Sequence, residues 1–244
     1  MRALILAAGR GSRMGAATEH GPKGMLEVLG RPLLAWQIDA LRAAGASEIA
    51  IVRGYRGEAL RFDVRYYDNP RWESTNMVAS LGCAAEWLRA GPCLVSYADL
   101  VYPPEAPRRL AETAAPIALL YDAHWRELWS QRFADPLDDA EALRLDARGR
   151  VLEIGGRPRD YARIEGQYMG LFQLTPEGAE RLFARSAELE PAARDRLDMT
   201  TLFARCVRAG DELHAVRYDG WWCEIDQPSD LALAERIAAQ GTAR

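Results

Sequence analysis

A chain of 244 residues, of which 49% are hydrophobic and 27% are charged, has the composition of an ordinary globular protein, and this excludes a disordered or fibrous chain. The formal net charge of −4 argues against non-specific nucleic-acid binding, which needs a basic surface. Four cysteines without a Cys-x-x-Cys pair, together with only three histidines, predict a reduced protein without a zinc site.

Targeting signals are not evident in the sequence. The apolar run at 3–8 is too short for the core of a signal peptide, and no stretch approaches the roughly 18 apolar residues of a membrane span. We therefore expect a cytoplasmic protein that binds neither a membrane nor nucleic acid. The length favours one domain over residues 1–244. The oligomeric state stays open, with a homodimer among the expectations.

Short apolar runs alternate with helical patterns through the first half of the chain. This order is typical of a parallel sheet covered by helices on both faces. Helices are expected after Pro32 and, through Leu88, after Ser74 and Thr75, because apolar residues recur there at helical spacing. The expected strands are 3–7, 48–52, 64–67, 93–97 and 117–121. The resulting β-α-β-β-α-β order predicts an α/β fold.

The pattern changes from residue 141. Two short apolar segments flank an Asp-Ala-Arg-Gly turn and predict a hairpin, inserted as a flap over about 141–156. The parallel pattern then returns. Its expected elements are strands at 168–174 and 213–217 and helices at 176–187, at 199–209 and after Pro228.

A glycine-rich loop follows the first strand and contains Gly9, Gly11 and Gly15. Glycines let the backbone turn sharply and aim its N–H groups at an anion, which suits a triphosphate. Arg13 and Lys23 could add positive charge beside the transferring and leaving phosphates. The glycine spacing fits neither a dinucleotide-binding fingerprint nor a P-loop, so a dehydrogenase is disfavoured. A tight turn that binds nothing is the alternative.

The loop and the segment after it resemble a known signature. The string Leu-Ala-Ala-Gly-x-Gly-Ser-Arg-Met at 6–14, followed by Pro-Lys-x-Met-Leu-x-Val-x-Gly-x-Pro-Leu-Leu at 22–34, is similar to that of the nucleotidyltransferase family, which includes sugar-1-phosphate nucleotidyltransferases and CTP:phosphocholine and phosphonate cytidylyltransferases. The resemblance implies a Rossmann-like three-layer fold with a mixed, mostly parallel central sheet. It implies Lys23 and Arg13 as catalytic cations. It implies nucleotide binding by Ala7, Ala8, Gly9, Arg10, Gly11 and Ser12.

Two aspartates far apart in the chain are candidate metal ligands. Asp99 follows a predicted strand and Asp226 follows an apolar run, so both could lie at the carboxyl ends of strands, where an open α/β sheet binds ligands. Mg²⁺ prefers one or two carboxylates together with phosphate oxygens and water. Either aspartate alone is more often a cap or turn residue. The family, however, carries metal-binding aspartates at these two positions, which implies a Mg²⁺ site here. We expect structural roles for Glu224 and Asp230.

The segment at 69–81 resembles that of phosphocholine and phosphonate cytidylyltransferases, in which it begins a helix near the pyrimidine. Asn76 and Ser80 lie four residues apart, on one helical face, and could offer a donor and an acceptor to cytosine. A helix cap with buried polar groups is an equal alternative. Tyr55, after Gly54, also resembles a family turn that borders the nucleotide.

Several residues lie in segments that the family places near its acceptor. An aromatic wall with a carboxylate can hold an ammonium group, although core packing is the alternative for each tryptophan. Asp122 is a second carboxylate candidate, whereas Arg126 and Arg132 are candidates for binding a phosphonate, so the charge preferred by the pocket stays open. The acceptor-binding candidates are Trp125, Trp129, Glu165, Tyr168, Gly170 and Trp222.

The hypothesis from the sequence is a Mg²⁺-dependent cytidylyltransferase. It would transfer CMP from CTP to a small phosphonate or phospho-amino-alcohol, of the 2-aminoethylphosphonate or phosphocholine type, and release pyrophosphate. An anionic phosphate or phosphonate oxygen can attack phosphorus without a dedicated general base. Two alternatives remain: a sugar-1-phosphate nucleotidyltransferase that uses UTP or dTTP, and a catalytically silent nucleotide-binding module.

Overall fold

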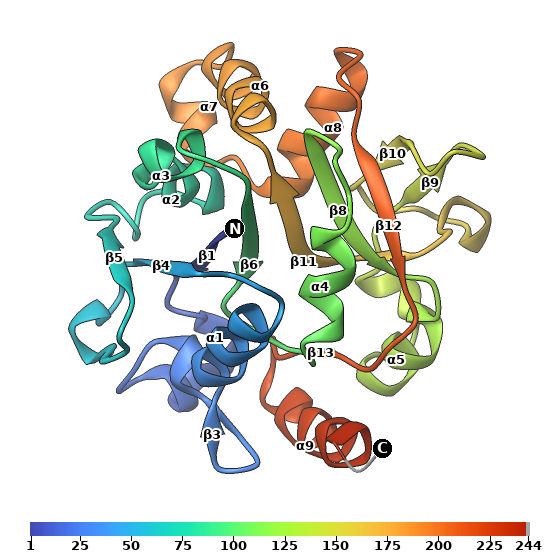
Figure 1. Ribbon diagram of the computed structural model, residues 1–244. Helices are drawn as coiled ribbons and strands as arrows, with labels where there is room; N and C mark the ends of the chain where they lie inside the picture. Colours follow the sequence, from blue (N-terminus) through green and yellow to red (C-terminus); the bar gives the residue numbers. More distant parts are fainter. Residues whose placement is uncertain (243–244) are drawn as a thin grey trace.

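The computed structural model describes residues 1–242, which fold around a seven-stranded central sheet (Figure 1). Its strands are β1 (Arg2–Ala7), β4 (Glu48–Arg53), β5 (Arg65–Asp68), β6 (Cys93–Tyr97), β8 (Ile117–Asp122), β11 (Gln167–Leu174) and β12 (His214–Tyr218). In space the order is β12-β8-β11-β6-β1-β4-β5. Only β11 runs antiparallel to its two neighbours, while the other pairs are parallel. The predicted mixed, mostly parallel sheet is confirmed.

Helices cover both faces of the sheet, because successive side chains of each buried strand point to opposite faces. In β1, Ala3 and Ile5 belong to one hydrophobic core, and Leu4 and Leu6 belong to the other. The first core includes residues of α1 (Leu33–Ala43), α4 (Glu105–Ala111), α5 (Trp125–Arg132) and α9 (Pro228–Thr242). The second includes residues of α2 (Met77–Cys83), α3 (Ala85–Arg89), α6 (Pro176–Ala187) and α8 (Met199–Arg208). The predicted three layers are visible in Figure 1.

Local sequence signals explain where several helices begin. The side chain of Thr175 accepts a hydrogen bond from the backbone N–H of Gly178 and caps α6, and Asp198 caps α8 through the N–H of Thr201. Helix α1 follows Pro32, as predicted. The short α7 (Pro191–Asp195) packs against α2. Among residues 1–242, no helix combines the length and the apolar character that crossing a bilayer requires.

The predicted hairpin is present as β9 (Leu143–Leu145) and β10 (Val151–Ile154), which pair antiparallel. Its turn uses Gly149 in the left-handed region, at φ +77°, and the Asp146 side chain accepts hydrogen bonds from two backbone N–H groups of the turn. Short strands also form outside the central sheet. They are β2 (Glu27–Val28) with β3 (Arg31–Pro32), and β7 (Leu100–Val101) with β13 (Cys223–Glu224).

The structure corrects three expectations about the elements. The strand expected at 168–174 within a parallel pattern is β11, which runs antiparallel to both neighbours, because a hydrophobic pattern does not specify strand direction. The single helix expected between Thr75 and Leu88 is two helices, because Ala84 leaves helical geometry between α2 and α3. The apolar run before Asp226 is not a strand of the central sheet. Only Cys223 and Glu224 are extended in it, and they pair with β7 instead.

Candidate active site

The site forms at the carboxyl ends of the parallel strands. Because β1 and β6 are parallel neighbours, the glycine loop after Ala7 and Asp99 after β6 emerge at the same edge of the sheet. The C-terminal segment joins them through the pairing of β13 with β7, and the backbone N–H of Ile225 donates to the carbonyl of Asp99 at 2.9 Å. Three segments distant in sequence therefore meet at one place.

Three carboxylates converge where these segments meet. Asp99, Glu224 and Asp226 each offer an oxygen, and the three oxygens lie within 4.8 Å of one another. The predicted convergence of Asp99 and Asp226 is therefore observed. Glu224, for which only a structural role was expected, is part of the same cluster. Three carboxylates this close repel one another and require nearby cations.

Lys23 supplies one such cation from the middle of the cluster. Its Nζ donates to Asp99 Oδ2 at 2.8 Å and to Asp226 Oδ1 at 2.5 Å. Burial by itself would lower the pKa of Lys23, but the two carboxylates outweigh burial and raise this pKa above its ordinary value. The side chain passes directly over Gly11, where a Cβ would lie 2.9 Å from Lys23 Cδ. Glycine at this position thus leaves room for the lysine.

Two arginines lie close to the carboxylate of Asp226. Arg13, whose side chain is 69% exposed, lies 3.1 Å from Asp226 Oδ2. Arg132 is completely buried and lies 4.0 Å from the same oxygen and 3.0 Å from Glu224. Burial acts against the ionised form of Asp226, but Lys23 and the arginines hold its pKa below the ordinary value. Burial, together with repulsion from Asp226, raises the pKa of Glu224.

The cluster fits a divalent cation of the magnesium type. Its ligand atoms are hard carboxylate oxygens, which Mg²⁺ prefers. Asp99 Oδ1 is buried and has no hydrogen-bond partner within residues 1–242, although buried polar atoms normally have one. Asp99, Glu224 and Asp226 are therefore the residues that would hold the ion.

The glycine loop presents the groups expected to bind a nucleotide. Ala7 and Ala8 are buried at the end of β1, whereas Gly9, Arg10 and Ser12 are exposed. The loop continues into a 3₁₀ helix over Ser12–Thr18. Tyr55 borders the loop, because its backbone N–H donates to the carbonyl of Ala8 at 2.9 Å and the Arg10 guanidinium lies over its ring.

Asn76 and Ser80 both have hydrogen-bond partners inside the protein. Asn76 caps α2 by accepting from the N–H of Met77, and its amide donates to the carbonyl of Arg196. The hydroxyl of Ser80 is buried and accepts from the amide of Asn69 at 3.0 Å. These contacts correspond to the capping alternative that the sequence left open.

The three tryptophans proposed for the acceptor are buried. Trp125, Trp129 and Trp222 are each at most 4% exposed and belong to one hydrophobic core. Trp222 donates its indole N–H to Asp122 at 3.0 Å. Asp122 also accepts from the N–H of His124, so this carboxylate already has partners. These contacts correspond to core packing, the alternative considered for the tryptophans.

The remaining acceptor candidates lie on or next to β11. Glu165 is exposed and accepts from the backbone N–H of Leu145. The ring of Tyr168 packs edge to face against Tyr97, and its hydroxyl is buried without a partner among residues 1–242. Gly170 has φ +75°, and a Cβ there would meet Tyr97 at 2.8 Å. A side chain at this position would clash with Tyr97, so the glycine makes room for Tyr97 and not for a ligand.

The two arginines considered as phosphonate ligands contact other groups of the protein instead. Arg126 stacks over the ring of Tyr161, 4.0 Å from its centroid. Arg132 has no exposed side-chain surface and binds carboxylates of the protein itself. The expectation that Arg132 contacts an acceptor is therefore wrong, because no solvent-facing atom of its side chain is left to do so.

Sequence reasoning missed two members of the site. Glu224 precedes Asp226 by two residues, and this alternation in an extended segment was the only signal for it. Arg132 was considered only for binding a phosphonate, and its place beside Asp226 was missed because it ends a helix whose position relative to Asp226 depends on the whole fold.

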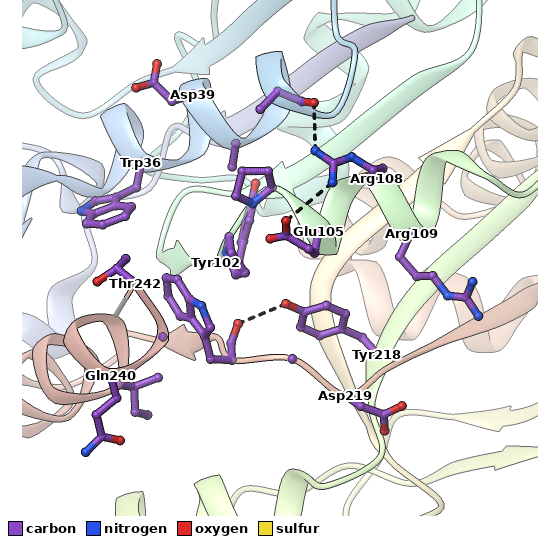
Figure 2. A pocket seen from close by; sticks show the side chains of 18 of the residues that line it. Trp36, Asp39, Tyr102, Glu105, Arg108, Arg109, Tyr218, Asp219, Gln240 and Thr242 are labelled. Atoms are coloured by element: carbon purple, nitrogen blue, oxygen red, sulfur yellow. Dashed lines mark hydrogen bonds and ion pairs between the residues drawn. The ribbon is translucent and has the colours of Figure 1, made fainter. Parts of the chain in front are cut away.

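A cavity of about 1240 Å³ lies between α1, α4, α9 and the segment before β13 (Figure 2). Aromatic side chains, including Tyr102, Tyr218 and Trp221, line it, with charged groups such as Arg108 and Asp219 around them. It contains none of the three carboxylates of the cluster. Its size alone does not identify it as the reaction site, because its lining lacks the convergent buried charges found at Asp99.

Comparisons with known proteins agree with this geometry. The family model described as "MobA-like NTP transferase domain" matches residues 3–157. CTP:phosphoglutamine cytidylyltransferase from Campylobacter jejuni is 34% identical over 95% of this chain and 98% of its own length. 2-Aminoethylphosphonate cytidylyltransferase from Lancefieldella rimae is 34% identical over 41% of this chain and 43% of its own. The inositol-1-phosphate CTP transferase from T. maritima shares the fold, with a TM-score of 0.77 at 19% identity, over 97% of this chain and 94% of that one.

Proposed function

Since this chain belongs to the family of MobA-like NTP transferase domains, we propose that it is a cytidylyltransferase that transfers CMP from CTP to a small phosphorylated or phosphonylated acceptor. The observation that carries the proposal is the bridge from Lys23 to Asp99 and Asp226, directly beside the glycine loop. This arrangement joins a phosphate-binding turn to a carboxylate site within a few ångströms of a buried cation.

The chemistry follows from these groups. An oxygen of the acceptor attacks the α-phosphorus of CTP, the bond from that phosphorus to the bridging oxygen breaks, and pyrophosphate leaves with the electron pair. Lys23 and Arg13 stabilise negative charge that builds up on the phosphates, and the N–H groups of the glycine loop hold them in place. Mg²⁺ at the three carboxylates would offset the repulsion between the two anions.

An acceptor that carries an amino group is part of the proposal. Two relatives that support it are named for phosphoglutamine and 2-aminoethylphosphonate, both of which contain nitrogen as well as phosphorus. Sugar-1-phosphate transfer is the second candidate, since a UTP–glucose-1-phosphate uridylyltransferase from Haloferax volcanii is 25% identical over 99% of this chain. A cytoplasmic location and a homodimer are also proposed.

A pyrophosphate-release assay tests the function. Each of ATP, GTP, CTP, UTP and dTTP is combined with phosphocholine, 2-aminoethylphosphonate, phosphoglutamine and glucose-1-phosphate, with Mg²⁺ and with EDTA. We expect release with CTP and an amino-bearing acceptor, and loss of release with EDTA. Release only with UTP or dTTP and the hexose phosphate would replace the proposal by the second candidate. Nucleotide binding without release under any combination would indicate a silent module.

A further inference from the structure

Arg132 lies next to the carboxylate cluster, on the side that faces the protein interior. It is the last residue of α5, its side chain has no exposed surface, and it lies over the rings of Trp129 and Phe133, 5.1 Å from each centroid. An arginine is rarely buried without anionic partners, because removing its charge from water is costly. The partners of Arg132 are the carboxylates of the C-terminal segment.

The guanidinium connects two of these carboxylates. Its Nε and Nη2 donate to the two oxygens of Asp230 at 3.3 and 3.2 Å, and its Nη1 donates to Glu224 at 3.0 Å. Such a bidentate pair fixes direction as well as distance, which a lysine ammonium does not. The hydrogen bond from Nη1 thereby keeps the carboxylate of Glu224 within the cluster.

Asp230 transmits this constraint to Asp226. It is 1% exposed, and its Oδ2 accepts from the backbone N–H of Asp226 at 2.9 Å and of Gln227 at 3.1 Å. The Gln227 side chain in turn donates to the carbonyl of Arg132. Arg132 and Asp230 together therefore set the backbone at Asp226 and the side chain of Glu224.

We infer that Arg132 is a positioning residue that, through Asp230, holds Glu224 and Asp226 in the geometry that binds a divalent cation. The inference rests on the proposed function, because that function supplies the ion. Groups that orient metal ligands from behind contribute about 10- to 100-fold to metal affinity or activity. Arg132 approaches Asp226 Oδ2 to 4.0 Å, but its guanidinium hydrogen bonds go to Glu224 and Asp230, so it positions the ligands through these two partners.

Binding of Mn²⁺ alone, followed by electron paramagnetic resonance of the free ion, tests the inference without relying on turnover. Arg132→Lys keeps the positive charge but removes the planar guanidinium that makes the bidentate contact. We expect it to weaken Mn²⁺ binding about 10- to 100-fold. In the pyrophosphate assay the Mg²⁺ concentration for half-maximal rate should rise by a similar factor, with little change in the KM for CTP. Asp230→Asn should also weaken Mn²⁺ binding. The double variant should lose less Mn²⁺ affinity than the product of the two single-variant factors.

Arg236→Lys is the matched control. Arg236 also joins α9 to α5, through the side chain of Gln131, but it is exposed and lies outside the cluster. It should leave Mn²⁺ binding unchanged. Equal Mn²⁺ affinities of wild type, Arg132→Lys and Asp230→Asn would overturn the inference and leave the proposed function standing. A wild-type protein that binds no Mn²⁺ and releases pyrophosphate in EDTA would overturn both the metal site and the inference.

Discussion

The carboxylate cluster and the cavity of Figure 2 lie at opposite ends of the same two short strands. Asp99 precedes β7 and Tyr102 follows it, while Trp221 precedes β13 and Asp226 follows it. In the cluster, one buried lysine is shared by two carboxylates. In the cavity, the charges form pairs near the surface, as between Arg108 and Glu105, whose side chains are both more than half exposed.

The difference favours the cluster over the cavity as the proposed reaction site, because the burial of charge, and not volume, distinguishes the two regions. An exposed ion pair contributes about 0 to 1 kcal/mol, because water screens it. A buried charged group left without its partner costs several kcal/mol, so the carboxylates of the cluster depend on Lys23 and the arginines beside them. In the proposed reaction Lys23 and Arg13 can stabilise charge on a bound phosphate, whereas the pairs around the cavity are already solvated.

Replacing aspartates in the two regions should give the largest difference in reaction rate between them. Asp99→Asn and Asp226→Asn should each lower the rate of pyrophosphate release by about three orders of magnitude or more, because each removes a ligand charge from the proposed metal site. Asp219→Asn, at the rim of the cavity, should leave the rate within about twofold. Steady-state rates with CTP and circular dichroism of each variant provide the measurement. Equal rates for all three would remove the distinction between the regions.

Lys23→Ala tests the cation at the centre of the cluster. The change removes the bridge between Asp99 and Asp226, and we expect the rate to fall about 10²- to 10³-fold, as for loss of a charged donor to a transition state. Single-turnover rates at saturating CTP separate this effect from weaker binding. A normal single-turnover rate would mean that Lys23 only neutralises the resting site.

The same substitution can be made at an arginine in each region. Arg13 and Arg217 are both more than half exposed, and each is paired with an aspartate. Arg13→Gln should lower the rate about 10-fold, since it faces the cluster, and Arg217→Gln should not change it. Rates with varied CTP concentration give the comparison. A larger loss in Arg217→Gln than in Arg13→Gln would contradict it.

The last predicted effect concerns the pH dependence of stability at the base of the hairpin. Burial, aided by repulsion from Asp198, raises the pKa of Glu141 to about 7 from its ordinary value of 4.5. Between these pH values the folded protein keeps a proton that the unfolded chain has lost, so stability falls as the pH rises. Glu141→Gln should remove this part of the slope, roughly 3 kcal/mol across the whole pH range between the two pKa values.

Urea unfolding at pH 4.5 and 7.5 measures that slope. Thr200, whose hydroxyl donates to Glu141, and the nearby Asp139 and Arg157 also face this carboxyl group and are unchanged in the variant. If wild type and Glu141→Gln show the same difference in free energy of unfolding between pH 4.5 and pH 7.5, Glu141 does not titrate in this range.

Much of the fold followed from local patterns in the sequence. Parallel strands of predicted position place their carboxyl ends at one edge, and this brings the glycine loop and Asp99 together. Hydrophobic periodicity carries no information about strand direction, so the strand expected at 168–174 within a parallel pattern was placed in the wrong direction, since β11 is antiparallel to both of its neighbours. The short run before Asp226 pairs with β7 for reasons of tertiary packing, and a local pattern does not show this.

The site was predictable only in part, because polar side chains have several uses. Asn76 is a good cap for the same reason that it is a good ligand: its amide has both a donor and an acceptor. A tryptophan such as Trp129 fits a core and a binding wall equally well in sequence. Arg132 became recognisable only when α5 and α9 were seen side by side.

The bridge from Lys23 to Asp226 spans 203 positions of the chain. Contacts of such separation form late, since a long loop must close before they add stability. During synthesis, a chain that has emerged only to residue 222 already contains all seven strands of the central sheet and yet lacks Glu224 and Asp226. The carboxylate cluster is thus completed by one of the last segments to be synthesised, and a product ending at residue 222 would keep the glycine loop but lack two of the three carboxylates.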